Sequence, residues 1–278
     1  MNLLFSGNDY VFDGIMTCLL SAFMRTKSED PFKVYVLTMD VSHLDSRYVP
    51  ISDKKIAYLE SVAQKYNQGN RIVKIDVTDI YAREFADCPN EQCYCSPYTL
   101  LRLFMDMIPD IPDKILYLDA DIMFNREPEL LYDIDVTGYE YAAARDHYGK
   151  YLIYPNYINA GVLLFNMPEC RQSGLFEKAR KLIKTRKLIF ADQSAIIRST
   201  TKKKMLAQKF NDQKFLHPHT VIRHFSKRLF WLPYPHTDNI KQWHVSKVHT
   251  VFRYDRFDDV LFEYIYLKKK YEKDGYEA

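Results

Sequence analysis

Residues 114–124 have the sequence Lys114-Ile115-Leu116-Tyr117-Leu118-Asp119-Ala120-Asp121-Ile122-Met123-Phe124. An apolar run of strand length comes first, two carboxylates follow, and apolar residues then resume. Acids at the carboxyl end of a strand lie where open α/β sheets bind ligands. Burying them is costly unless a cation compensates, and Mg²⁺ or Mn²⁺ can bridge carboxylates to phosphate oxygens. The segment favours a metal site at a strand end, and a pair of solvated turn aspartates is the alternative.

Other apolar runs of strand length alternate with amphipathic stretches on both sides of this segment. Residues 13–25 place Ile15, Leu19, Ala22 and Phe23 at helical spacing, so the chain opens with a β-α-β unit. This alternation predicts an α/β fold with a mostly parallel, Rossmann-like central sheet flanked by helices. The predicted strands are 2–6, 33–38, 71–76, 114–118, 141–144 and 161–166.

The second half of the chain predicts two further helices and an irregular segment. Ser96 can cap a helix over 97–108, with Pro97 at its first position. Residues 217–243 are dense in proline and aromatic residues and predict loops. Residues 257–273 mix apolar residues with lysines and predict an amphipathic helix that packs on the domain, with membrane contact as the alternative. We therefore expect one main domain, 1–256, and a short basic helical tail, 257–278.

Composition limits the class of protein. The chain has 278 residues, 47% of them hydrophobic and 27% charged, which is typical of a globular protein. The net charge is +3, and lysine and arginine gather within 202–256 and at 268–270. This clustering favours an anionic partner such as a phosphate or a membrane surface, and we expect no nucleic-acid binding. No apolar run approaches the ~20 residues that span a bilayer.

Cysteine usage bears on the cellular setting. There are five cysteines, an odd number, and no secretory signal precedes the first strand. A cytoplasmic protein, peripheral at most to the inner face of the membrane, fits best. Cys93 and Cys95, with Cys88 nearby, lack the spacing of a zinc site and have no second pair, so structural zinc is not expected.

The motif Leu116-Tyr117-Leu118-Asp119-Ala120-Asp121 resembles the metal-binding segment of glycosyltransferase family 8. These retaining transferases include bacterial lipopolysaccharide galactosyl- and glucosyltransferases and glycogenin. Further motifs follow in family order from residue 2 to about 231. The resemblance implies a GT-A-type fold and a UDP-sugar donor, with Asp119 and Asp121 as metal ligands and Ala120 beside the donor.

On the nucleotide side, the resemblance concerns the first strand and the helix at 97–108. The strand runs into a polar turn that meets base and ribose in the family, so it implies nucleotide contacts by Ser6, Asn8, Asp9 and Tyr10. Arg102 matches a helical arginine directed toward the donor, whose planar fork can clamp phosphate or sugar oxygens. An ordinary βα turn and an exposed helical arginine are the alternatives.

On the sugar side, Asn159-Ala160-Gly161 precedes a buried strand. Small residues permit close approach of a sugar ring, and Asn159 can hydrogen-bond its hydroxyls. This segment resembles a family motif and implies donor-sugar contacts. Asp146 occupies a position from which the family often contacts donor or acceptor sugar.

The remaining matches are a helix start and a histidine. Asp192 and Gln193 resemble the family's Asp-Gln segment, which implies Asp192 on donor-sugar hydroxyls and Gln193 by the anomeric carbon, although Asp192 could simply cap a helix. His224 resembles the third metal ligand, and an imidazole favours Mn²⁺ over Mg²⁺. The family continues with Gly and then Lys-Pro-Trp, but this chain departs from that pattern, so Lys227 or Arg228 is expected to bind the diphosphate.

Together these matches imply retaining transfer of a hexose, glucose or galactose, from a UDP-sugar to a carbohydrate or glycolipid acceptor, as in glycan or lipopolysaccharide-type assembly. Three alternatives remain open. A sugar-phosphate nucleotidyltransferase would carry a Gly-rich basic loop after the first strand, where this chain has Ser6-Gly7-Asn8-Asp9. A haloacid-dehalogenase-like phosphatase would carry its Asp-x-Asp near the chain start. The third is a catalytically impaired nucleotide-sugar-binding protein.

Overall fold

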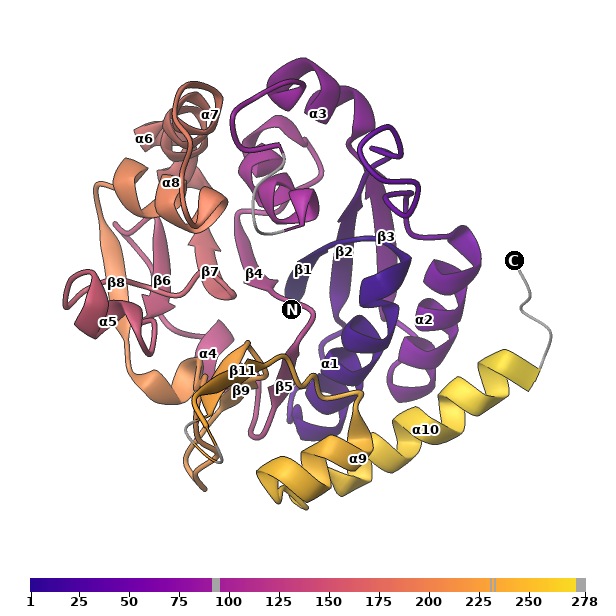
Figure 1. Ribbon diagram of the computed structural model, residues 1–278. Helices are drawn as coiled ribbons and strands as arrows, with labels where there is room; N and C mark the ends of the chain where they lie inside the picture. The colour runs from indigo at the N-terminus through magenta and orange to yellow at the C-terminus, as the bar shows by residue number, and fades with distance from the viewer. Residues whose placement is uncertain (92–95, 231, 233, 274–278) are drawn as a thin grey trace.

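The computed structural model describes residues 1–91, 96–230, 232 and 234–273. A seven-stranded sheet in the order β3-β2-β1-β4-β7-β6-β8 lies between two layers of helices (Figure 1). Six strands run in one direction and β7 runs against them. The strands are β1 Asn2–Ser6, β2 Lys33–Thr38, β3 Arg71–Asp76, β4 Lys114–Leu118, β6 Tyr141–Ala144, β7 Val162–Asn166 and β8 Lys203–Leu206.

The mostly parallel α/β sheet confirms the predicted fold class. Five of the predicted strands have the predicted bounds, and β7 begins one residue later than expected. β8 was not predicted, because Lys203 and Lys204 interrupt its apolar character. It is the edge strand and only partly buried, so these lysines reach solvent.

Both faces of the sheet are apolar, as expected for parallel strands covered by helices. In β1, Leu3 and Phe5 pack into one core and Leu4 into the other. Helices α1 Phe12–Arg25, α2 Asp53–Tyr66 and α10 Asp258–Lys273 line the first core. The second is lined by α3 Thr78–Phe85, the 3-10 helix η2 Pro97–Met107, α6 Met167–Ser173, α7 Leu175–Thr185 and α8 Ala191–Ser199.

The helix predicted at 97–108 is η2, whose amino end is fixed by Ser96. The Ser96 hydroxyl accepts a hydrogen bond from the backbone N–H of Tyr98, and Pro97 occupies the first turn. The helix is buried over most of its length, Arg102 included. Short helices elsewhere are η1 Asp9–Val11, α4 Glu129–Tyr132, α5 Gly149–Leu152, η3 Gln208–Phe210, α9 Val245–Lys247 and the π-helical turn η4 Val248–Phe252.

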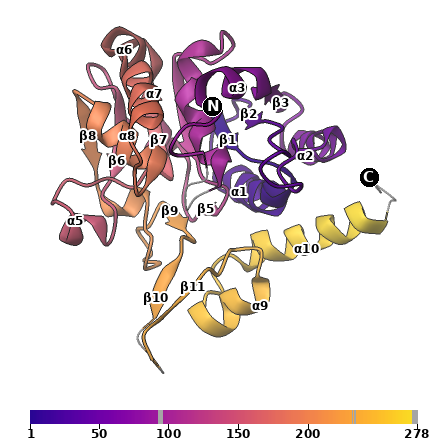
Figure 2. The same ribbon diagram turned by 45° about the horizontal axis from the view of Figure 1, so that its top comes forward.

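Residues 217–243 contain more regular structure than their proline content predicted. β9 Ile222–His224 pairs antiparallel with β5 Ile122–Phe124, directly after the two aspartates. β10 Arg228–Phe230 and β11 His236–Asp238 form a hairpin that projects from the body of the molecule (Figure 2). These strands have three residues each, too few for a period to be visible in the sequence.

The tail helix α10 packs on the domain. Val260, Leu261, Tyr264 and Leu267 are buried in the core that contains α1. The Tyr58 hydroxyl of α2 donates a hydrogen bond of 2.7 Å to the Leu267 carbonyl. Among the described residues, no helix has the length and apolar character needed to span a membrane.

Candidate active site

The carboxyl ends of β1 and β4 flank the point where the strand order reverses. The chain goes from β1 to β2 and β3 on one side and returns to β4 on the other, so a ligand crevice is expected between these ends. A cavity of about 230 Å³ opens there, lined by Ser6 at the end of β1 and by Asp119 and Asp121 after β4. The antiparallel β7 brings the Gly161 carbonyl to the Asp119 N–H, at 2.8 Å.

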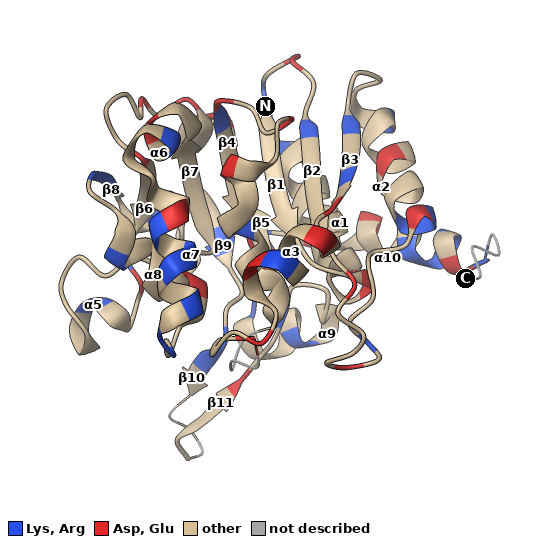
Figure 3. Cartoon of the chain, turned by 90° about the horizontal axis from the view of Figure 1, so that it is seen from above, with Lys and Arg blue, Asp and Glu red and all other residues tan. Residues whose placement is uncertain are grey.

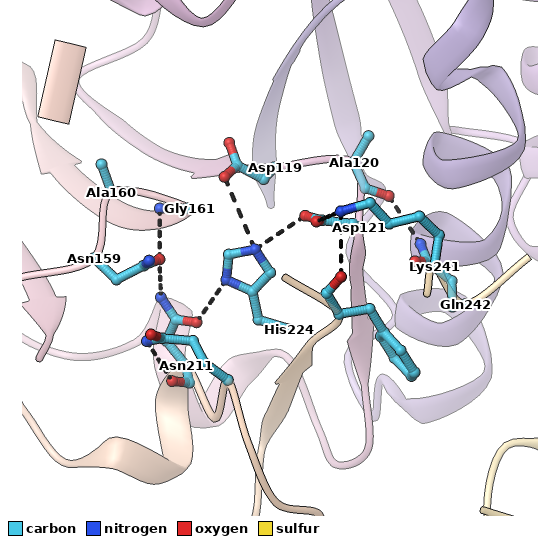
Figure 4. Close-up of polar contacts among 12 residues, drawn as sticks. Asp119, Ala120, Asp121, Asn159, Ala160, Gly161, Asn211, His224, Lys241 and Gln242 are labelled. Carbon is cyan, nitrogen blue, oxygen red and sulfur yellow. Dashed lines mark hydrogen bonds and ion pairs between the residues drawn. The ribbon is translucent and has the colours of Figure 1, made fainter. Parts of the chain in front are cut away.

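Asp119, Asp121 and His224 meet at this edge, and ligand atoms of the three lie within 4.8 Å of one another. The pairing of β9 with β5 places His224 opposite Ile122, so its ring reaches back to the preceding acid (Figure 4). His224 Nε2 lies 3.0 Å from Asp121 Oδ1 and 4.0 Å from Asp119 Oδ2. The structure thus brings together the three predicted metal ligands.

A glycine makes room for this triad. A Cβ on Gly161 would lie 2.4 Å from His224 Cε1 and 2.7 Å from Asp119 Oδ2, closer than atoms can pack. The other ring nitrogen, His224 Nδ1, lies 3.0 Å from Asn211 Oδ1. Such an outer hydrogen bond orients a ligating imidazole. Two oxygen ligands and one oriented imidazole fit Mn²⁺ or Mg²⁺, and the imidazole favours the transition metal.

Lys241 stands next to Asp121. Its ammonium group forms an ion pair with Asp121 Oδ2 and donates to the Phe225 carbonyl at 3.2 Å. Burial by itself would raise the pKa of Asp121, but Lys241 and His224 hold that pKa well below the ordinary value. The carboxylate is therefore ionised and ready to bind a cation.

Gln242 fixes the loop between the two acids. It is buried, and its amide nitrogen donates to the Ala120 carbonyl at 2.8 Å and to the Thr17 hydroxyl at 3.0 Å. The loop lies so close to α1 that a Cβ on Gly14 would be 2.4 Å from the Ala120 carbonyl oxygen. The Asp-Ala-Asp backbone is thus held from both sides.

Arg102 is buried and contacts both acidic motifs. Its guanidinium lies 3.0 Å from Asp119 Oδ1 and 3.2 Å from Asp192 Oδ2, and it also donates to the Ala160 carbonyl. It stacks on the Tyr117 ring, whose hydroxyl donates to Asp119 Oδ1 at 2.9 Å. Burial raises the pKa of Asp192. With three nitrogens engaged by protein acceptors, this arginine orients the acids, whereas the resemblance implied a direct clamp on the donor.

The sugar-side residues form a hydrogen-bonded chain that ends at the triad. Asp146 accepts from the N–H groups of Tyr148 and Gly149 at the start of α5 and from the Asn159 amide at 3.0 Å. Asn159 in turn accepts from Asn211 at 2.9 Å, and Asn211 contacts His224.

Gln193 joins the same loop from α8. Its side-chain oxygen accepts from the Ala160 N–H at 2.9 Å. Asp192 and Gln193 therefore lie in the first turn of α8, whose N-cap position is occupied by Phe190. Gln193 is bonded to the 159–161 segment and Asp192 is paired with Arg102, and their contacts with a donor sugar stay a prediction.

On the nucleotide side, the four candidates are placed differently. The Ser6 hydroxyl is buried at the cavity and has no hydrogen-bond partner among the described residues. Asn8 also lines the cavity, but its side chain already bonds the Tyr10 N–H and the Arg47 carbonyl. Asp9 is turned toward Ser52 and Lys55, and the exposed Tyr10 side chain does not line the cavity.

Lys227 and Arg228 are not among the described residues that line the cavity, so their predicted role at the diphosphate stays a prediction. Arg228 begins β10 and stacks on the rings of Phe230 and Phe252. Lys241 and Trp243 line the cavity instead. Lys241-Gln242-Trp243 is similar to the Lys-Pro-Trp that the resemblance implied after His224, and the β10–β11 hairpin lies between the two. This Lys-x-Trp pattern is the sequence signal that could have pointed to Lys241, and we find no comparable signal for Asn211.

Cys18 and Cys170 are free, buried thiols, Cys88 is partly buried, and Cys93 and Cys95 lie outside the described residues.

The fold, a mostly parallel sheet with two acids and a histidine at its switch point, is of the GT-A class of glycosyltransferases. Solved structures of that class match this chain. The galactosyltransferase LgtC, solved with donor and acceptor sugar analogues, matches with a TM-score of 0.64 at 17% identity, over 95% of this chain and 96% of that one. GlyE of Streptococcus pneumoniae matches with a TM-score of 0.61 at 18% identity, over 98% and 63%. These likenesses establish the fold.

The sequence places the chain more narrowly. The model of glycosyl transferase family 8 matches residues 7–213, and the chain belongs to that family. A Haemophilus influenzae protein named "Putative glycosyltransferase" is 25% identical over 189 residues, 64% of this chain and 52% of that protein. Glycosyltransferase GlyB of Streptococcus pneumoniae is 27% identical over 177 residues, 63% and 38%. The chain thus spans about half or less of these curated relatives.

Proposed function

We propose that this chain is a retaining hexosyltransferase that takes glucose or galactose from a UDP-sugar and transfers it to a hydroxyl of a carbohydrate or glycolipid. One observation carries the proposal: in a family 8 chain, Asp119, Asp121 and His224 converge at the switch-point cavity beside the Lys241 ammonium group. A cytoplasmic setting and membrane contact through the tail stay predictions.

Asp119, Asp121 and His224 would hold Mn²⁺, or Mg²⁺, against the donor diphosphate. A bound divalent cation stabilises negative charge on the departing UDP. Tyr117 and Arg102 fix the orientation of the Asp119 carboxylate, and Asn211 fixes the His224 ring. A ligand set held in this way needs little reorganisation on binding.

Lys241 would bind the diphosphate. Its ammonium group already neutralises Asp121 at the cavity, so a phosphate oxygen can exchange for the carboxylate without leaving the cation unpaired. Ser6, with its buried and unpartnered hydroxyl, would contact the nucleoside. Asn8, Asp9 and Tyr10 stay proposed contacts, and the first two would have to give up protein partners.

Gln193 would lie by the anomeric carbon, with Asp192, Asn159 and Asp146 around the donor sugar. An amide is a poor nucleophile, so a covalent intermediate on Gln193 is disfavoured. The acceptor hydroxyl would attack from the side on which UDP leaves, its oxygen bonding the anomeric carbon as the bond to the diphosphate oxygen breaks. Its proton would pass to the departing diphosphate. This course retains the anomeric configuration.

A nucleotide-sugar-binding protein without transferase activity is the second candidate. The observation that favours it is Asp192, which is buried and paired with Arg102 and would have to reorient to reach a sugar hydroxyl. The family model and the two curated relatives concern glycosyltransferases and lend no support to a nucleotidyltransferase or a phosphatase.

The test combines thermal unfolding with release of UDP. With Mn²⁺ present, UDP-glucose or UDP-galactose at about 100 times its Kd should raise the Tm by about 4–6 °C. UDP release should be measurable in the same sample. Asp121→Asn should abolish both effects, and Asp110→Asn, which changes an exposed aspartate away from the cavity, should leave them intact. Tm shifts without UDP release under any acceptor would favour the binding protein, and no shift with either sugar would refute the proposal.

A further inference from the structure

A second cavity, of about 500 Å³, lies beside the residues proposed to surround the donor sugar. Its walls are the segment around α5 and the connection from α7 into α8, and its lining includes Tyr154, Tyr157, Leu188, Phe190 and Ile197. Tyr157 accepts a backbone hydrogen bond from Asp146, and Ser194 in the lining directly follows Gln193. The cavity therefore lies against the residues proposed to surround the transferred sugar.

The rim of this cavity carries exposed aliphatic side chains. Ile189 is 81% exposed and Ile153 is 49% exposed, and both line the cavity; Leu152, which precedes Ile153 in the chain, is 81% exposed. Aromatic rings alone would suit the face of a sugar ring. Aliphatic side chains gain little free energy from contact with sugar hydroxyls, and they favour contact with hydrocarbon instead. In Figure 3, α5 lies toward the carboxyl edge of the sheet, the edge at which β10 and β11 project.

The charges at the rim have one sign. Lys187 and Arg198 line the cavity, and neither forms an ion pair or side-chain hydrogen bond within the described part of the chain. No acidic residue is among the described residues that line it. Two uncompensated cations beside an apolar wall complement a ligand with a hydrocarbon chain and an anionic head.

We propose that this cavity and its rim bind an anionic membrane lipid, with hydrocarbon against Ile189, Phe190 and Ile153 and the phosphate between Lys187 and Arg198. The lipid would be the anchored end of the acceptor, whose hydroxyl is then presented to the donor sugar beside Gln193. This inference deepens the proposed function and rests on it, because the lipid is identified as part of the acceptor.

The experiment uses the full chain and two probes. Octyl phosphate, titrated calorimetrically below its micelle concentration, should bind at least tenfold more tightly than octyl glucoside or inorganic phosphate. Vesicles of phosphatidylglycerol should carry the protein in flotation, and vesicles of phosphatidylcholine should carry much less. Ile189→Asp should abolish both interactions. The double variant Lys187→Gln/Arg198→Gln should weaken them about tenfold to thirtyfold, since each cation near an anionic surface contributes independently.

Two control variants change residues of the same kinds outside the cavity. Lys181→Gln removes an exposed lysine of α7 that does not line the cavity, and Phe262→Asp alters an exposed apolar residue of α10. Both should bind lipid like the parent chain. Phosphatidylglycerol binding lost in Phe262→Asp but kept in Ile189→Asp would overturn the proposal in favour of the tail. Equal affinity for octyl glucoside and octyl phosphate would overturn it in favour of a neutral sugar site.

The donor assay separates the two proposals. Ile189→Asp and the double variant should keep the Tm shift given by UDP-sugar and Mn²⁺, because the mutated side chains do not line the donor cavity. A chain that shows this shift but binds neither lipid probe refutes the lipid site and leaves the proposed function standing. Lipid binding without any donor shift would refute the role of the lipid as acceptor.

Discussion

At the scale of single residues, the site is organised by charge balance around Asp119 and Asp121. Each carboxylate has a cation that the fold supplies, Arg102 for Asp119 and Lys241 for Asp121. Burial alone would raise the pKa of the Asp121 carboxyl group, and the neighbouring cation is part of what keeps that pKa low. Arg102 is locked by stacking on Tyr117, whereas Lys241 comes from a loop of the C-terminal segment. We infer that Lys241 is the partner that a ligand can displace.

Gly161→Ala should weaken Mn²⁺ binding at least tenfold. The new methyl group would overlap His224 and Asp119, which are held by Asn211, Tyr117 and Arg102 and so cannot both retreat. Titration of Mn²⁺ by calorimetry measures the effect. Gly69→Ala is the matched control, because its methyl group would also crowd a neighbour, Pro31 at 2.9 Å, but far from the site. Unchanged Mn²⁺ affinity in Gly161→Ala would argue against the assigned ligands.

Lys241→Gln should weaken UDP binding about 10-fold to 100-fold, since a charge-assisted contact with phosphate contributes about 1.5–3 kcal/mol. Arg228→Gln should change the affinity less than twofold, because that side chain packs on aromatic rings outside the cavity. Equilibrium titration with UDP in Mn²⁺ measures both. The reverse order of effects would restore the cation first expected from the sequence.

At the scale of elements, some features of the site follow from the sequence and others depend on pairing between distant segments. β1 and β4 are buried and apolar at every central position, so their ends and the acids after β4 were predictable. His224 comes from a three-residue strand whose register with β5 cannot be seen in either segment alone. Lys241 was missed because the β10–β11 hairpin lies between it and His224, whereas the resemblance implied a cation directly after His224. Asn211 contacts the triad only through tertiary packing.

Glu140, which directly precedes β6, joins two segments that are distant in the sequence. It is buried and accepts hydrogen bonds from the backbone N–H groups of Thr201, at 2.9 Å, and Lys202, at 3.2 Å, and from the Thr200 hydroxyl. Burial alone would raise the pKa of Glu140, but hydrogen bonds from Ser173, Thr200 and their neighbours lower it below the ordinary value. The carboxylate therefore ties the turn after α8 to β6.

Glu140→Gln should lower the free energy of unfolding by about 1–3 kcal/mol at pH 7. Because the folded-state pKa is depressed, the ionised group stabilises the fold fully above its unfolded pKa, about 4.3, and this contribution disappears as the pH falls through the lower folded pKa. The difference between parent and variant should thus shrink below about pH 4. Urea unfolding across pH measures it, with the exposed Glu177→Gln as control. A pH-independent difference would assign the loss to packing.

At the scale of the whole molecule, α10 raises the question of whether residues 257–278 are a separate tail. The helix is amphipathic, as its sequence predicted, but its apolar side is covered. Leu261 and Leu267 are fully buried, Lys268 pairs with Asp13 of α1 at 2.8 Å, and Arg25 pairs with Asp259 at 2.7 Å. A helix with this much of its apolar surface inside the core of α1 and α2 should unfold together with them.

Leu261→Ala should therefore lower the free energy of unfolding of the entire chain by about 2–5 kcal/mol, the range for removing a large buried side chain. Phe262→Ala, its 58% exposed neighbour, should change it by less than about 0.5 kcal/mol. Urea unfolding followed by far-ultraviolet circular dichroism and by tryptophan fluorescence should give one coincident transition in the parent and in both variants, because Trp243 packs against the core that α10 completes. If Leu261→Ala instead produces an early transition that leaves the fluorescence midpoint unchanged, α10 is a separable tail, and membrane contact through its apolar side regains support.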